Sequence, residues 1–457
     1  MSHRNQSAKI STGRRGLVFN LIWTGSSAAT SQGALFISNI VFARILGGTA
    51  LADYLVVLTI ATMTPALFSL GLERLGVIIL VNSDQAHLSN RFRAIATVTL
   101  FSSLAGGLAA GVAAAVGPFL SIVDPGVAIL VGFLVALENA RIMLADLPRT
   151  WGRADFSTVA GPALPRLLVL LITCIAHFQF QVHISIEFLL LVLVGSTAIS
   201  LFIGVHFIRR LMKSHAHLTA HPPERPEHLW TLVKSGLPLS IANVALVVLS
   251  YADTLIVAAH FNALTLASFA LISRTSNLLG NLKTMLNVAV MPILSVRPES
   301  SKDSSEQLVI ARAVMTMLFV LVAPIALLAG FWASDFFGWL FGEQYAAASA
   351  ASIWLMLGQL VSIAMGLAGT ILLRDGRQII IMWIQVSAAA LTLAAMIVAA
   401  RTGDIALVGL ASGSGTALCA IIMALVLWRK SQAQSWILGP VALTHTITTY
   451  LRQRNTK

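Results

Sequence analysis

The chain has 457 residues, of which 57% are apolar and only 11% are charged, and its formal net charge is +12. Soluble globular domains carry about 25% charged residues, so this composition excludes an ordinary water-soluble protein and indicates one embedded in a bilayer. Nucleic-acid binding is not expected, because no recognition motif accompanies the positive charge.

A transmembrane helix needs about 20 mostly apolar residues, and a window of about 19 residues predicts twelve such spans. The expected fold class is an all-α polytopic membrane protein, since open strands would leave backbone groups unpaired in lipid. The predicted spans are 18–42, 54–80, 94–116, 127–147, 162–180, 187–208, 236–258, 264–294, 312–333, 347–372, 379–400 and 405–428.

Basic residues are concentrated in every second loop. When the N-terminus is numbered as inside, 23 of the 30 Lys and Arg residues fall on that side, and only Arg44 and Arg401 fall outside. Cytoplasmic flanks of spans carry the excess of Lys and Arg. We therefore expect a multi-pass protein of the cytoplasmic membrane with both termini in the cytoplasm.

The longest polar stretch divides six spans from six, which predicts two six-helix bundles. A weak internal repeat at an offset of 215 residues aligns Ile40–Ala43 with Leu255–Ala258 and Leu51–Tyr54 with Leu266–Phe269, as duplication of a six-helix unit would predict. The predicted units are a cytoplasmic segment 1–15, an N-terminal bundle 16–208, a cytoplasmic linker 209–231, a C-terminal bundle 232–430 and a cytoplasmic amphipathic basic tail 431–457.

Glycine spacing predicts two places of close helix packing. Gly107 with Gly111 and Gly409 with Gly413 each form a GxxxG pattern inside a span. The tail after the last span is too short and interrupted for a thirteenth span, so we expect an interfacial helix with a basic end.

An enzyme is not expected from this sequence. The largest outer loop, 333–345, is short, whereas membrane polymerases, ligases and glycosyltransferases carry a sizeable outer loop. The sequence holds no phosphate-cradling Gly loop, HExxH helix or Gly-x-Ser-x-Gly turn. Cys174 and Cys419 lie within spans and indicate no metal site, and we expect no cofactor.

Charges within spans are the candidate functional residues, because each costs about 2.5–3.5 kcal/mol on insertion scales and usually faces a cavity or a partner. If three or more of the cations face the space between the bundles, that space attracts anions, and a lipid-linked diphosphate would suit it. The cations are Arg74, Arg141, Arg166, Arg274 and Lys283.

Three acidic residues, Glu73, Glu138 and Asp253, leave a second interpretation open. They are candidates for ion coupling, but they could equally neutralise the cations or satisfy packing needs. Glu138 and Arg141 are three residues apart, which puts them on one helical face. Arg74 and Arg166 lie near cytoplasmic ends of spans, where snorkelling to headgroups is an alternative to ligand binding.

Several short motifs occur in the order found in a known family. Phe42–Gly47, followed by Ala52-Asp53-Tyr54, resembles the A-R-x-L-G … F-G-x-Y pattern of the Wzx-type lipid-linked oligosaccharide flippases. These form the polysaccharide biosynthesis branch of the multidrug/oligosaccharidyl-lipid/polysaccharide exporter superfamily. Further similar stretches are Ser69–Leu72, Gly236–Pro238, Asp253–Ile256 and Phe341–Tyr345. Two departures, Leu51-Ala52 in place of Phe-Gly and the lack of a Gly turn at His260–Asn262, leave subfamily and substrate open.

The resemblance implies a V-shaped pair of six-helix bundles in a bacterial inner membrane. Such a flippase moves polyprenyl-diphosphate-linked oligosaccharides outward by alternating access, for surface or exopolysaccharide biosynthesis. Arg44, Asp253 and Arg274 are carried over as family positions, whereas the other cations rest on the charge argument alone. For such a substrate, the candidates for holding uncharged sugar hydroxyls are Asn277, Asn281, Ser273 and Thr275. The implied partners are the lipid-linked oligosaccharide, membrane lipids, and polysaccharide polymerase and chain-length proteins.

Three alternatives stay open at this point. A multidrug and toxin extruder of the same superfamily would export organic cations by ion exchange, and it would need an acidic cavity. A major facilitator porter also has six plus six spans, but its Asp-Arg-x-Gly-Arg-Arg-like turn is absent from 81–93. A membrane glycosyltransferase or polymerase is less favoured because the outer loops are short.

Overall fold

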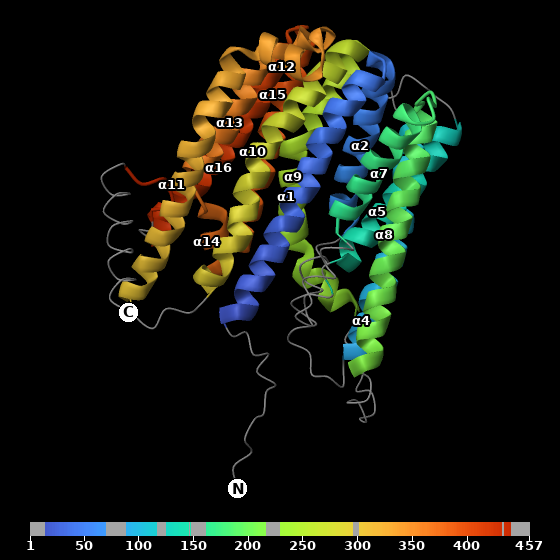
Figure 1. Ribbon diagram of the computed structural model, residues 1–457. Coiled ribbons are helices and arrows are strands. Elements are labelled where there is room, and N and C mark those ends of the chain that lie inside the picture. Colours follow the sequence, from blue (N-terminus) through green and yellow to red (C-terminus); the bar gives the residue numbers. More distant parts are fainter. Residues whose placement is uncertain are drawn as a thin grey trace.

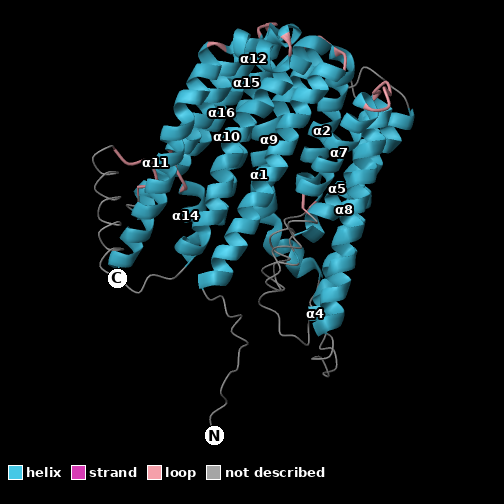
Figure 2. Cartoon of the chain, in the orientation of Figure 1, coloured by secondary structure: helices cyan, strands magenta, loops and turns pink. Residues whose placement is uncertain are grey.

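The computed structural model describes residues 14–69, 88–116, 125–145, 147, 161–215, 229–295, 301–431 and 434–439. Within these ranges every long regular element is an α-helix (Figure 2). The expected all-α architecture is therefore confirmed, and Figure 1 shows the helices running roughly side by side in one bundle.

The helices of the N-terminal half are α1 (Arg14–Ile45), α2 (Gly48–Phe68), α4 (Leu88–Val116), α5 (Pro125–Ala145), α7 (Ala163–Phe178) and α8 (Ile186–His215). Those of the C-terminal half are α9 (Leu229–His260), α10 (Ala263–Ser295), α11 (Ser301–Phe331), α12 (Ala333–Phe341), the 3₁₀ helix η4 (Glu343–Ala351), α13 (Ser352–Ala364), α14 (Ala368–Arg374), α15 (Gln378–Arg401) and α16 (Ile405–Ser431).

Where the structure describes the chain, each of the twelve predicted spans corresponds to helical structure; residues 70–80 of the second span, 54–80, lie outside the described residues. In the described part of the chain, nine helical stretches are long and apolar enough to cross a membrane. The other three predicted spans are α1, the 16-residue α7, and α10. α10 has 33 residues but carries Arg274, Asn277, Asn281 and Lys283, so its length would span a bilayer while its composition is that of a cavity wall.

The tenth predicted span, 347–372, is not one continuous helix. It consists of the end of η4, α13 and α14, with a break at 365–367. Gly366 at the centre of this break has φ +69°, a conformation that glycine adopts without strain. A further short helix, α12, lies in the segment 333–345 that was expected to be an outer loop.

The segment after the last helix covers the break in the tenth span. The expectation of a helical tail is wrong for the described residues 434–439, which are irregular; 440–457 lie outside the described part. The Ile437 amide donates to the Ala364 carbonyl at 2.9 Å, and the Ser435 hydroxyl donates to the Met365 carbonyl at 2.9 Å. These bonds satisfy carbonyls that the end of α13 leaves free.

The two halves pack together through a few helices. α2 contacts α9 and α10, and α1 contacts α10 and α12. The helices lie close together at the end that carries α12 and spread toward the opposite end, where α1 begins (Figure 1). The turn between α1 and α2 and the turn between α9 and α10 have boundaries that differ by the same 215 residues, in agreement with the internal sequence repeat. The bundle division at 209–231 stays a prediction, because 216–228 lie outside the described part.

Small residues set the closest helix contacts, as the GxxxG spacings predict. A Cβ added at Gly107 of α4 would lie 2.7 Å from the Gly132 carbonyl oxygen of α5. In the C-terminal half, a Cβ at Gly409 of α16 would lie 2.7 Å from the Cβ of Ala351, and one at Gly413 would collide with the Trp354 carbonyl oxygen of α13. Backbones this close leave no room for side chains.

We therefore expect Gly413→Ala to destabilise the protein by about 2 kcal/mol, because α13 and α16 must separate to admit the methyl group. Thermal unfolding in detergent measures this effect. Gly195→Ala in α8 is the matched control, since a Cβ there meets nothing within 4 Å. Equal melting temperatures for the two variants would show that the α13–α16 contact is looser than described.

Candidate functional site

Two adjacent cavities lie inside the bundle. The central cavity, with a volume of about 40 Å³, lies between the halves and is lined from α1, α2, α7, α9 and α10. The C-terminal cavity, of about 350 Å³, is lined only by residues of the C-terminal half. Tyr251, Asn277 and Asn281 line both cavities, so the two spaces are neighbours across one wall of side chains.

Arg274 enters the central cavity from α10 and bonds to the other half of the protein. One terminal nitrogen of its guanidinium donates to the Leu55 carbonyl at 2.9 Å and to the Thr59 hydroxyl at 3.0 Å, both on α2. The side chain is 8% exposed, and its Nε has no partner among the described residues. A buried guanidinium with an unused N–H group can still donate a hydrogen bond to an anion.

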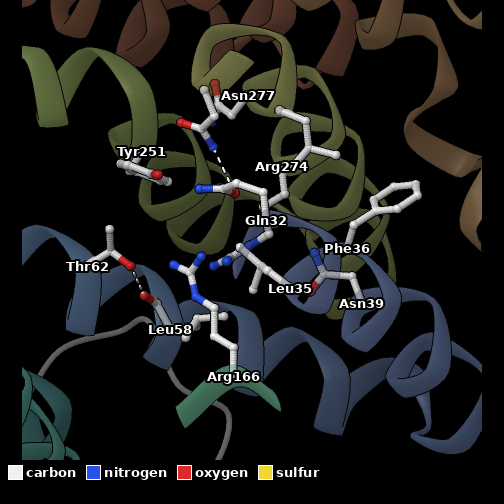
Figure 3. Close-up of a pocket in the computed structure, with 12 residues that line it drawn as sticks. Gln32, Leu35, Phe36, Asn39, Leu58, Thr62, Arg166, Tyr251, Arg274 and Asn277 are labelled. Carbon is white, nitrogen blue, oxygen red and sulfur yellow. Dashed lines mark hydrogen bonds between the residues drawn. The ribbon is translucent and has the colours of Figure 1, made fainter. Parts of the chain in front are cut away.

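Arg166 enters the same cavity from α7, on the opposite wall. Its guanidinium donates to the Ser31 hydroxyl at 2.7 Å and to the Ser31 carbonyl at 3.3 Å on α1. Figure 3 shows Arg166 and Arg274 reaching into the cavity from different helices, with Gln32 and Asn277 nearby. The two cations face one space, and the carboxylates of Glu138 and Asp253, which lie behind its walls, offset part of the charge of Arg166 and Arg274, respectively.

Lys283 lines the C-terminal cavity. Its ammonium group donates to the Ser362 carbonyl at 2.7 Å and to the Ser362 hydroxyl at 3.0 Å. Ser362 lies in the last turn of α13, where free carbonyls carry partial negative charge and favour a cation. Lys283 therefore both stabilises the end of α13 and supplies the positive charge of this cavity.

Asn277 and Asn281 connect the two cavities. The side-chain nitrogen of Asn277 donates to the Ser250 carbonyl at 2.8 Å, and its side-chain oxygen accepts from the side-chain nitrogen of Gln359 at 3.1 Å. The Asn281 amide donates to the Gln32 side-chain oxygen at 3.0 Å, which joins α10 to α1. Arg274, Asn277 and Asn281 recur at helical spacing and form one polar stripe of α10 facing the cavities.

Other predicted site residues lie elsewhere. Arg141 is 3% exposed and forms an ion pair with Glu138 on α5, as the three-residue spacing predicts, and neither residue lines the two cavities. Asp253 is buried and also lies outside the cavity walls. It accepts bonds from the Thr254 amide at 2.7 Å, from Ser273 at 2.9 Å and from Ser412 at 3.2 Å. These contacts match the packing interpretation of Asp253, and its role in ion coupling stays a prediction. Glu73 and Arg74 lie outside the described residues.

The sign of charge in the cavities is uniform. Among the described residues that line them, Arg166, Arg274 and Lys283 are cationic, and none is Asp or Glu. The neutral lining residues that were not singled out from the sequence include Gln32, Gln359 and Gln385. A carboxamide side chain inside an apolar span would have identified these residues in the sequence, because such a side chain must find polar partners within the bilayer.

Arg44 links α1 to α12 at one end of the molecule. Its guanidinium donates to the Trp339 carbonyl at 2.7 Å and to the Leu340 carbonyl at 3.3 Å, both in the last turn of α12. The α12 C-terminus ends at Gly342 with φ +122°. A cation on the free carbonyls of a helix C-terminus is stabilising, so this contact joins α1 to the C-terminal half.

Comparison with solved structures shows a shared fold. A multidrug resistance MATE family transporter of the MOP superfamily in an inward-facing conformation aligns with TM-score 0.63 at 12% identity, covering 89% of this chain and 96% of that one. An outward-facing conformation of such a transporter gives TM-score 0.51 at 12% identity, covering 92% of this chain and 96% of that one.

A third solved structure is a MOP superfamily transporter from Pyrococcus furiosus, for which reverse polarity of the binding pocket is said to suggest a different function. It aligns with TM-score 0.55 at 12% identity, covering 91% of this chain and 96% of that one. No protein-family model and no curated protein matches the sequence. The chain therefore has the fold of MATE and other MOP superfamily transporters.

Arg44→Ala is expected to loosen the closed α12 end, because it removes the charged contact between α1 and α12. Spin labels on Thr49→Cys and Arg401→Cys, both exposed at that end, report the separation of the halves by pulsed dipolar spectroscopy after both native cysteines are replaced by serine. We expect a larger population of long distances in the Arg44→Ala background. Arg429→Ala, an exposed position at the other end of α16, is the control. An unchanged distribution in both backgrounds would mean that Arg44 does not hold this end closed.

Proposed function

We propose that this chain is a membrane transporter that flips polyprenyl-diphosphate-linked oligosaccharides across the cytoplasmic membrane by alternating access. The observation that carries the proposal is the charge of the two cavities. Three cations line the two cavities. Among the described lining residues, none is a carboxylate. Such a space favours an anion and disfavours a cation.

A diphosphate suits this set of donors. Guanidinium groups bind phosphate oxygens through two parallel hydrogen bonds, and an ammonium group binds them as a point charge. In a membrane-embedded site the effective dielectric constant is low, so each charge interacts more strongly than in water. The polyprenyl tail would stay in the bilayer while the headgroup crosses.

The arrangement of the helices supports a cycle that begins at the cytoplasmic side. Arg44 links α1 to α12 at one end, and the helices spread toward the opposite end, where α1 begins (Figure 1). The central cavity, at about 40 Å³, holds no more than a few waters. Substrate binding would therefore require the halves to separate, and the bonds from Arg274 to Leu55 and Thr59 would be exchanged for bonds to the diphosphate.

The second candidate function is export of organic cations by ion exchange. It is favoured by the fold, because the solved structures that align include multidrug resistance MATE transporters. It is opposed by the cavity charges, since a cationic substrate needs acidic or aromatic groups around it. The Pyrococcus furiosus transporter, described as having a pocket of reverse polarity, indicates that this fold accommodates both signs.

We expect Lys283→Ala and Arg274→Ala each to lower surface glycan output roughly tenfold or more when they replace the native gene in its host. Losing a charged hydrogen bond to the headgroup costs about 1.5–3 kcal/mol. Surface polysaccharide and diphosphate-linked intermediate are measured together, and the intermediate should accumulate on the cytoplasmic side. Membrane insertion of both variants is checked by their abundance in membranes.

Two further variants separate charge from packing. Thr59→Val removes a partner of Arg274 but keeps the cation, so it should retain most of the output, and Arg401→Ala removes an exposed cation outside both cavities. Normal glycan output from both Lys283→Ala and Arg274→Ala would contradict the proposal. Normal glycan in a deletion strain, combined with raised sensitivity to cationic drugs, would favour the extruder function.

A further inference from the structure

The C-terminal cavity differs chemically from the central cavity. Its walls carry five carboxamides, from Asn277, Asn281, Asn287, Gln359 and Gln385, together with several hydroxyls. Lys283 is the single charged residue among its described lining residues, and its ammonium group is already bonded to Ser362. The cavity is thus polar, with one positive charge at Lys283 and neutral donors and acceptors over the rest of its walls.

These walls exclude two kinds of ligand. An organic cation would meet no carboxylate, and Tyr251 is the single aromatic ring among the described lining residues, so no aromatic cage is present. A fully apolar ligand would leave the carboxamides without partners, which is costly in a buried site. A neutral ligand rich in hydroxyl groups matches the walls, since carboxamides both donate and accept hydrogen bonds.

Gln385 on α15 shows bonding capacity that the protein itself does not use. Its side chain is 8% exposed and lines the cavity, and its Oε1 oxygen has no hydrogen-bond partner among the described residues. Gln359 on α13 lines the same cavity and donates to the Asn277 side-chain oxygen at 3.1 Å. The Gln385 oxygen is shielded from solvent in this conformation, so a hydroxyl in the cavity would reach this unused acceptor once the Gln385 side chain turns toward it.

The volume and position of the cavity are also suitable. Its volume of about 350 Å³ lies at the lower end of the range of small-molecule sites. It adjoins the cationic central cavity through Tyr251, Asn277 and Asn281. Once the halves separate and the central cavity widens, a molecule with an anionic part and a neutral polyhydroxyl part would contact both.

We propose that the C-terminal cavity is the binding site for the uncharged sugar units of the substrate, with Gln385 and Gln359 as hydrogen-bonding specificity residues, while Arg166, Arg274 and Lys283 hold the diphosphate. This inference rests on the proposed flippase function and adds a division of the substrate between two sites. Sugar selectivity would then reside in α13 and α15, and recognition of the anion would reside in α7 and α10.

The division is tested by binding to the full chain in lipid nanodiscs with two probes. One probe is polyprenyl diphosphate without sugar, and the other is polyprenyl diphosphate carrying the oligosaccharide extracted from the deletion strain. We expect Gln385→Leu and Gln359→Leu each to weaken binding of the sugar-bearing probe roughly three- to tenfold and to leave binding of the bare diphosphate unchanged. Arg274→Ala should weaken both probes.

Gln378→Leu is the matched control, because Gln378 lies on α15 seven residues before Gln385 but is exposed and lines neither cavity. The inference is overturned, with the flippase function intact, if wild-type protein binds both probes equally or if Gln385→Leu and Gln359→Leu do not weaken the sugar-bearing probe selectively. Both proposals fail together if no diphosphate-linked oligosaccharide accumulates in the deletion strain or if wild-type protein binds neither probe.

Discussion

A positive charge inside a bilayer is tolerated only where polar groups accept its hydrogen bonds. α10 carries two such charges, Arg274 and Lys283. Each finds its partners on a different element: Arg274 on α2 of the other half, and Lys283 at the C-terminal end of α13. The position of α10 is therefore fixed from both sides. It forms the shared wall of the two cavities, and its polar stripe determines what both can bind.

The broken tenth span is the second feature on which the site depends. Lys283 bonds to the last turn of α13 from the cavity side, and residues 434–439 cover the break from the other side. The positive φ of Gly366 allows the chain to turn at the break. Arg312 on α11 donates a hydrogen bond to the Trp436 carbonyl at 2.8 Å. The cavity wall and the segment after α16 are thus parts of one packed unit, although they are distant in sequence.

Hydropathy was sufficient to predict the helical class and the helical regions that are described, because the bilayer imposes both length and polarity on each span. The spacing of Glu138 and Arg141 placed both on one helical face and left their pairing open beside a role in the cavity, and the structure pairs them outside the cavity walls. The sequence could not predict which intramembrane charges meet, because Arg166 and Arg274 come from helices that are far apart in the chain. The neutral walls formed by Gln359 and Gln385, the break at Gly366 and the short α12 also depend on packing between distant elements.

The central claim is that the cavities bind an anion and not a cation. The most direct measurement reconstitutes the purified protein in proteoliposomes and offers it a fluorescent polyprenyl-diphosphate-linked sugar and, separately, tetraphenylphosphonium with an imposed ion gradient. The account predicts movement of the sugar-bearing lipid between leaflets and no protein-dependent movement of the organic cation. Gradient-driven movement of tetraphenylphosphonium without movement of the lipid would contradict it.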